Sequence, residues 1–380
     1  MPRFVFPLCE LPTEIVEQIC SHLCAHCQDP MTARPAQSFG YQWALFQNRM
    51  ALVNLTRTCH ALHRIVTPFL YHTLWAASQP KHMAHFLDGV LRNPHMRSRV
   101  RVVDLWRTAS RAFRDDHALE LLEQTAAGLA QPASEVQGLW IQPVLEHRSG
   151  VRDTPIVFEA LLLLLFSLCR NIEQAHLTFY AADKVRLHPL PRQLHDGQPL
   201  MANLRRLTIT FSMGVYNAWY LSQIEPLTAA AVNLEYLECD QVYGVDPPRA
   251  RTDLPERPWC GRLRELRVSY GPTILQPGLS EAEFPRLLEL LRHTRLERFV
   301  IGGHWFNWEH GDSGGGAKPA EMALFTARVA EMGRCLAGGT LPHLRQVAIA
   351  GWCISAEQAG PLAELLRPHG VEFTTVVNIR

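Results

Sequence analysis

The chain has 380 residues, with 37 basic and 36 acidic side chains, and 47% of its residues are hydrophobic. This length exceeds the roughly 100 to 200 residues of an ordinary domain, so we expect two domains or one elongated array of repeats. A net charge of +1 supplies no general cationic field for a nucleic acid backbone or an anionic bilayer. The composition therefore disfavours nucleic acid and membrane surfaces as partners.

Neither a membrane span nor a secretory signal is visible. The longest apolar run, Leu161 to Cys169, is about half of the roughly 20 residues that cross a bilayer, and it predicts a buried helix instead. Met1 to Glu10 contains one basic residue and no long apolar region, unlike a secretory leader. We expect a protein of the cytoplasm, the nucleus or both, with its ten cysteines as free thiols.

Residues 1–75 are predicted to form one unit of short helices. Pro12 stands where a first helical turn tolerates proline, and apolar residues then follow at every fourth position from Ile15. A second stripe predicts a helix that ends at Thr67-Pro68. The members of this stripe are Leu52, Leu55, Cys59, Leu62 and Val66. Asp29 to Gly40 is predicted as a long internal loop, followed by a short helical stretch. Helices of this length bury little surface alone, so we expect them to pack against a partner.

Residues 76–380 alternate between helical and strand patterns. One template, apolar-x-x-apolar-x-apolar, recurs along this part and predicts a strand at each occurrence. It begins at Val100, Val136, Ile172, Leu204, Leu234, Leu263, Leu296 and Leu344. Further strands are expected at Leu70 to Trp75 and at Val371 to Val377. The long interval after the seventh template indicates an insertion at residues 302–318, rich in glycine and tryptophan.

The intervals between templates contain predicted helices. They are Asp115 to Leu129, Pro155 to Cys169, Ser280 to His293, Pro319 to Ala337 and Ser355 to Arg367. Because each unit leaves an apolar edge that only its neighbour can cover, the units should stack into a curved parallel sheet. The fold class is therefore α/β, with a short all-α unit followed by an irregular solenoid of alternating helices and parallel strands.

Three segments of the first unit resemble the F-box motif, particularly as it occurs in filamentous fungi. They are Leu11 to Ile19 with its early proline, Leu55 to Leu62, and Pro68 to Tyr71. The following units resemble the leucine-rich repeats that often stand behind an F-box. They lack the asparagine or cysteine that usually follows the last apolar position by three residues, so irregular curvature is expected.

The resemblance implies a substrate-recognition subunit of an SCF-type ubiquitin ligase. The F-box would dock on the Skp adaptor, and through it on a cullin, while the repeats would hold an unknown target protein. The residues expected to bind the adaptor are Leu11, Pro12, Ile15, Ile19, Leu55, Cys59 and Leu62. Such a subunit has no catalytic residue and no cofactor; it raises the effective concentration of a target lysine near an enzyme held elsewhere.

Target binding is expected on the outward positions of the repeat strands. Because side chains alternate across a strand, the third, fifth and seventh template positions face away from the core. The candidates combine aromatic and charged groups: Asp104, Trp106, Trp140, His176, Tyr236, Glu238, Asp240 and Arg267. The same face of the last two repeats carries small or apolar residues such as Val300 and Ala348, which suits a covered surface.

Other functions stay open as alternatives. The first is a leucine-rich scaffold that acts outside any ligase. Cys20, Cys24 and Cys27 have the spacing of iron-sulfur ligands in radical enzymes, but Cys20 falls on a predicted core helix. Cys24 and Cys27 could instead bind zinc together with Cys59 and His63. We expect no metal at either set.

The last alternative is a protease. Gly311 to Gly315 spells the nucleophile signature of trypsin-like proteases. Those enzymes are disulfide-bonded double β-barrels, whereas this chain alternates helices and strands. We therefore expect no enzymatic activity from this motif.

Overall fold

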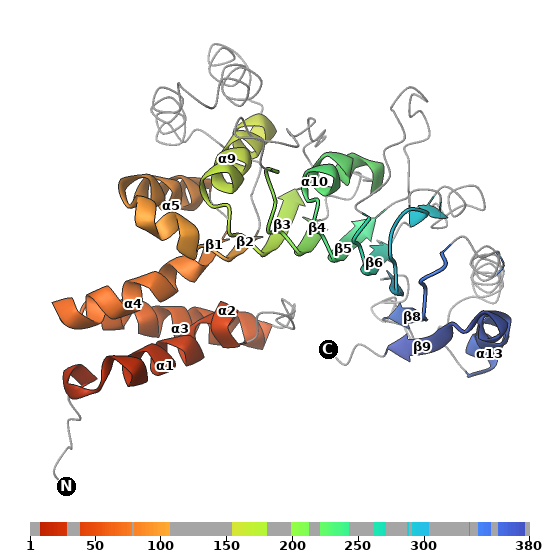
Figure 1. The fold of residues 1–380 in the computed structure, drawn as a ribbon, viewed down its shortest axis with the longest axis horizontal. Coiled ribbons are helices and arrows are strands. Elements are labelled where there is room, and N and C mark those ends of the chain that lie inside the picture. Colours follow the sequence, from red (N-terminus) through yellow and green to blue (C-terminus); the bar gives the residue numbers. More distant parts are fainter. Residues whose placement is uncertain are drawn as a thin grey trace, which may run out of the picture.

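A computed structural model describes residues 8–28, 39–77, 80–106, 154–180, 199–212, 221–242, 261–270, 287–288, 291–303, 334, 341–350 and 356–376. It consists of N-terminal helices followed by a nine-stranded parallel sheet with helices on one side. Figure 1 shows the strands as a curved row, with helices along its outer side and the N-terminal helices at one end. The fold is α/β.

The N-terminal helices enclose a small apolar core. They are η1 (Leu8–Glu10), α1 (Thr13–Leu23), α2 (Ala25–Gln28), α3 (Phe39–Thr56) and α4 (His60–His72). The core consists of Val16, Cys20, Leu52, Leu62 and Val66. Pro12 directly precedes α1, where the missing N–H of proline costs no helical hydrogen bond. The predicted first helix is confirmed.

The sequence predicted a single helix for the second apolar stripe, but the stripe is divided between α3 and α4. α3 ends at Thr56 and α4 begins at His60, with Cys59 extended between them at φ −157° and ψ 165°. The hydroxyls of Thr56 and Thr58 donate to the carbonyls of Val53 and Leu55, at 2.7 and 2.8 Å. These bonds satisfy carbonyls of the last turn of α3 that have no helical partner, so the chain can turn there while the apolar spacing continues.

The predicted stop at Thr67-Pro68 is also wrong. α4 continues through Pro68 to His72, although an internal proline removes one helical N–H donor. The Thr67 hydroxyl donates to the His63 carbonyl at 2.5 Å, and the helix is held by the burial of Leu62 and Val66. Of the predicted loop, residues 29–38 lie outside the described part of the chain, and Gly40 belongs to α3.

The nine strands lie in the sheet in the order of the sequence, each parallel to the next. They are β1 (Thr73–Ala77), β2 (Val102–Trp106), β3 (Gln174–Tyr180), β4 (Arg206–Ser212), β5 (Tyr236–Val242), β6 (Glu265–Tyr270), β7 (Arg298–Gly303), β8 (Gln346–Ala350) and β9 (Glu372–Val376). The predicted last strand is confirmed as β9, while the predicted first strand is confirmed only from Thr73, because Leu70 to His72 belong to α4.

The register of the sheet follows the template. Residues at the fourth template position pair with one another across the strands and are all buried. They are Val103, Ala175, Leu207, Leu237, Leu266, Phe299 and Val347. A parallel sheet whose equivalent apolar positions stack in this way has one continuous core.

One template occupies no place in this row. The occurrence at Val136 predicted a strand between β2 and β3, but these two strands pair directly, with Val103 beside Ala175. Residues 136–141 lie outside the described residues. An apolar spacing over six residues is too short to define a strand by itself, and here it did not predict a neighbour in the sheet.

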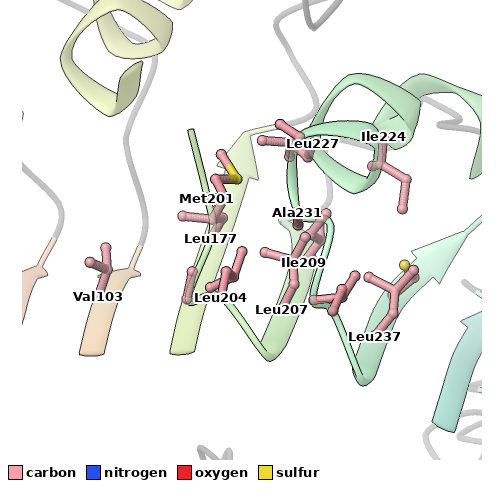
Figure 2. Close-up of a cluster of buried hydrophobic side chains, with 14 of the residues drawn as sticks. Val103, Leu177, Met201, Leu204, Leu207, Ile209, Ile224, Leu227, Ala231 and Leu237 are labelled. Atoms are coloured by element: carbon pink, nitrogen blue, oxygen red, sulfur yellow. The ribbon is translucent and has the colours of Figure 1, made fainter. Parts of the chain in front are cut away.

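Helices pack on the apolar face of the sheet. They are α5 (Pro80–Arg92), η2 (Pro94–Arg99), α9 (Thr154–Leu168), η5 (Leu221–Ile224), α10 (Glu225–Ala230), α13 (Ala356–Leu366) and η6 (Arg367–His369). Figure 2 shows Ile224 and Leu227 of η5 and α10 in one cluster with Ile209 and Leu207 of β4. The predicted helices at 155–169 and 355–367 are confirmed, while Asp115 to Leu129 lies outside the described residues.

The run Leu161 to Phe166 is buried throughout, at 0 to 2% exposure, as its all-apolar sequence predicted. Among the described residues, no helix combines the length and apolarity that a membrane span requires. Gly370 follows η6 in the left-handed region, at φ 71°, which a glycine adopts without the steric cost of a Cβ. The chain turns there into β9.

Three asparagines connect four successive units. Asn171 donates to the carbonyl of Ser98 at 3.0 Å, Asn203 to Arg170 at 2.9 Å, and Asn233 to Ala202 at 2.6 Å. Each amide stands directly before the first template position and reaches the preceding unit. The sequence analysis expected no asparagine ladder because it looked three residues after the last apolar position of each template, whereas these asparagines precede the first apolar position.

The second template position forms a row of alternating charge. Backbone hydrogen bonds of 2.8 to 2.9 Å join the successive members. The row reads Arg101, Glu173, Arg205, Glu235, Arg264, Glu297 and Arg345. Arg101 Nη1 lies 2.7 Å from Glu173 Oε1. Neighbouring strands of a sheet are about 4.8 Å apart. Opposite charges therefore lie side by side where the strands begin, an arrangement that stabilises cross-strand pairs. We call these residues the charge row.

Candidate functional site

The residues predicted to bind an adaptor lie on α1 and on both sides of the break before α4. Ile15 is 42% exposed, although Val16 beside it is 4% exposed and belongs to the core. Pro12 is exposed, and Leu11 and Ile19 are half-buried. α1 therefore has one face in the core and a largely polar exposed face on which Ile15 is the apolar residue.

The remaining members of this set play a supporting part in the fold. Leu62 is 2% exposed and lies in the core of the N-terminal helices, and Leu55 and Cys59 are half-buried against it. These three side chains hold α3 and α4 together, whereas Pro12 and Ile15 are accessible.

A polar network covers the face of the sheet that points away from the helices. The Tyr236 hydroxyl donates to Glu238 Oε2 at 2.6 Å. The guanidinium carbons of Arg206 and Arg267 lie 4.3 and 5.5 Å from the centroid of the Tyr236 ring, a cation–π geometry. Tyr236 is only 7% exposed. Burial, followed by the nearby Glu238 carboxylate, raises the pKa of Tyr236, so its hydroxyl remains a donor.

Further charged groups extend this network in both directions. Glu265 accepts from Arg267 at 2.7 Å and from Arg298 at 3.4 Å. Toward β2, His176 Nδ1 lies 3.2 Å from Asp104 Oδ1, within ion-pair distance but outside hydrogen-bond geometry. His176 Nε2 lies 3.3 Å from the Thr210 hydroxyl. The arrangement presents basic and acidic groups that are already held in place.

The structure brings together most, but not all, of the predicted target-binding residues. Asp104, His176, Tyr236, Glu238 and Arg267 share one face of β2 to β6. Trp140 lies outside the described residues, and Trp106 and Asp240 are placed only as backbone positions of β2 and β5. Arg206 and Glu265, at the third template position, complete the network that the sequence reasoning described only in part.

The same face changes character toward the end of the sheet. Val300 and Ala348 are 3 and 0% exposed, which agrees with the expectation that this part is covered. Most of the insertion at 302–318, including the glycine-rich segment with the protease signature, lies outside the described residues.

The cysteines suggested as metal ligands divide between two environments. Cys20 is 0% exposed within the core of the N-terminal helices, where burial raises the pKa of its thiol to about 11. Cys24 and Cys27 are instead close to two histidines, His26 and His72, with ligand atoms that all lie within 4.8 Å of one another. The three cysteines therefore do not share one site.

The zinc set that the sequence suggested is not assembled. Cys59 precedes α4 and His63 lies in its first turn, where His63 Nδ1 is 3.1 Å from the Thr56 carbonyl. His72 ends the same helix, nine residues after His63, or roughly 13 Å along the axis. Cys24 and Cys27 lie at the His72 end. The sequence reasoning missed His72 because it ended the helix at Pro68.

No family model, curated protein or solved structure matches the chain.

Proposed function

We propose that this protein is a substrate-recognition subunit of an SCF-type ubiquitin ligase. Its N-terminal helices dock on a Skp adaptor as an F-box does, and its sheet, as a solenoid resembling leucine-rich repeats, holds the target protein. The subunit is not an enzyme; its contribution is to position a target near a ubiquitin-loaded enzyme.

The observation that carries this proposal is the set of exposed apolar side chains on the N-terminal helices. Large hydrophobic side chains with substantial exposure are few among the described residues, and most occur here. They are Leu8 (38%), Ile15 (42%), Phe46 (41%) and Met50 (38%), with Val232 (39%) elsewhere. Leu8 and Ile15 flank the Leu11-Pro12 pair on which the F-box resemblance depends. Leu8 and Ile15 lie on η1 and α1, and Phe46 and Met50 on α3. Exposed apolar side chains next to a small core are typical of a surface that binds another protein.

The polar face of the sheet supports the second half of the proposal. Its charged groups are half-buried and paired with one another, which limits the side-chain entropy that binding would cost. The pairing of Tyr236 with Arg206 and Arg267 also places aromatic and guanidinium groups together, as binding interfaces frequently do. A target segment with both acidic and basic side chains suits this face.

The test is co-purification with a Skp adaptor and a cullin. Replacement of both Leu8 and Ile15 by Asp should weaken adaptor binding by at least about tenfold, because each change puts a charge into a desolvated apolar contact. Val232→Asp is the matched control, since Val232 has nearly the same exposure as Ile15 and lies after α10 rather than on α1. It should leave adaptor binding unchanged.

Two results would contradict the proposal. If the parent chain does not bind the adaptor, or if the Leu8 and Ile15 variant binds as well as the parent, the N-terminal helices are not an F-box surface. If the adaptor complex forms but recruits no cullin, the ligase role is wrong and the scaffold alternative takes its place.

A further inference from the structure

The Cys/His cluster lies where the N-terminal helices meet the sheet. Cys24 directly follows α1, His26 and Cys27 belong to α2, and His72 is the last residue of α4, next to β1. Cys24 is 2% exposed, and the other three are half-buried. Segments about 45 residues apart in sequence thus converge on one point.

The spacing of the four side chains matches a tetrahedral metal site. His72 Nδ1 lies 3.6 Å from Cys24 Sγ and 3.4 Å from Cys27 Sγ, and His26 Nδ1 lies 3.8 Å from Cys27 Sγ. Around a tetrahedral zinc ion with Zn–S of ~2.3 Å and Zn–N of ~2.0 to 2.1 Å, sulfur and nitrogen ligands are roughly 3.6 Å apart. The three distances therefore agree with ligands around one ion.

We propose that Cys24, His26, Cys27 and His72 form a structural zinc site. Two thiolates and two imidazoles are a common ligand set for zinc, and the C-x2-C spacing of Cys24 and Cys27 is typical of such sites. Two thiolates neutralise the charge of Zn²⁺, so the complete site can be enclosed. With all four positions filled by side chains, the site is closed to substrate and therefore structural rather than catalytic.

The conformation of α2 gives independent support. It is a four-residue helix with no fully buried residue, and so short a helix is unstable by itself. Its turn is nevertheless regular, with the Cys24 carbonyl accepting from Cys27 and Gln28 at 3.0 Å. Ligation of three side chains from this turn would explain why it holds its shape without a hydrophobic anchor.

The surroundings orient the imidazoles. The His72 ring stands edge-on to His26, with centroids 5.4 Å apart, and is tilted against Phe69 at 5.3 Å. The guanidinium of Arg49, which interacts electrostatically with Cys24, donates to the Thr73 carbonyl at 2.9 Å. A positive charge near a thiol favours its thiolate form.

Zinc at this point would join the helical part to the sheet. The His72 carbonyl accepts the backbone N–H of Arg101 at 2.9 Å, so the ligand also belongs to the hydrogen bonds that begin the sheet. An ion that ties His72 to Cys24 and Cys27 fixes the ends of α1 and α4 at β1. The sequence expectation of no metal is revised accordingly.

The experiment measures metal in the full-length protein purified without chelator from zinc-supplemented cells. The parent should contain about one zinc per chain. The double variant Cys24→Ser with Cys27→Ser, and separately His72→Ala, should contain almost none. Cys59→Ser with His63→Ala is the matched control, because it removes one thiol and one imidazole at the opposite end of α4 from His72, and it should keep the full zinc content.

A second measurement does not depend on whether the ligand variants fold. Parent protein loaded with Co²⁺ should show the intense visible absorption of a tetrahedral, thiolate-ligated ion, and His26→Ala should lower zinc affinity by at least about tenfold. A parent without zinc that also fails to bind Co²⁺ overturns the proposal, whether the thiols prove free or joined in a Cys24 to Cys27 disulfide. Full zinc in the His72→Ala variant, or unchanged affinity in His26→Ala, overturns the four-residue assignment.

Discussion

Replacement of Tyr236 by Phe isolates one hydrogen bond of the polar network. The hydroxyl donates to the Glu238 carboxylate at 2.6 Å, while the ring, with Arg206 at 4.3 Å from its centroid, is retained in the variant. Hydrogen bonds to charged groups contribute about 1.5 to 3 kcal/mol. Because Glu238 is half-buried and water can replace part of the bond, we expect the free energy of unfolding to fall by about 1 to 2 kcal/mol.

Urea unfolding followed by tryptophan fluorescence would measure the change as a lower midpoint at an unchanged slope. Glu238→Gln and the double variant complete a cycle in which the two effects should not add. Burial raises the pKa of Tyr236 in the folded state, so its stabilising effect should be constant below about pH 10, the unfolded value, and decline above it. A Tyr236→Phe variant within about 0.3 kcal/mol of the parent would refute this account of the network.

Three further predictions follow from the same structure. Asn233→Ala should destabilise by about 1 kcal/mol, measured by the same unfolding assay, because the carbonyl of Ala202 loses its donor at 2.6 Å; an unchanged midpoint would argue against a stabilising asparagine ladder. Arg101→Glu should destabilise by less than about 1 kcal/mol, since its pair with Glu173 is 35 and 34% exposed, and Arg101→Gln, which removes the attraction without adding a repulsion, should cost less. Cys169 is 0% exposed and burial raises the pKa of its thiol to about 12, so alkylation of the native protein, read by peptide mass, should spare it until the chain unfolds.

The repeating part of the fold was predictable because its signal is periodic. The template placed Leu207, Leu237 and Leu266 at equivalent positions, and they pair as expected. Burial on one face and polarity on the other follow from alternation along a strand. The template at Val136 lies outside the described residues, and the direct pairing of β2 with β3 leaves no place for a strand between them. The charge row distinguishes this template from the others, because its second position is the uncharged Gln137, whereas the second position of every other template is charged.

The Cys/His cluster could not be assembled from the sequence, for a different reason. Its ligands depend on where α4 ends, and the rule that proline stops a helix placed that end before His72. Tertiary packing of Leu62 and Val66 against the N-terminal core outweighs the lost hydrogen bond at Pro68. The spacing of four placed Ile15 and Ile19 on one stripe of α1, but it did not show that the core residues of this helix are Val16 and Cys20.

The charge row has a consequence for how many units the sheet can hold. Positive and negative side chains alternate from Arg101 to Arg345, so units of the same sign are always separated by an even number of steps along the sheet. Removing one unit would bring two like charges to neighbouring strands, whereas removing two adjacent units would restore the alternation. The same condition applies when two copies of the chain exchange strands: a shift by an odd number of units opposes like charges, and only even shifts remain compatible. The row thus favours correct stacking by making half of the wrong alignments repulsive.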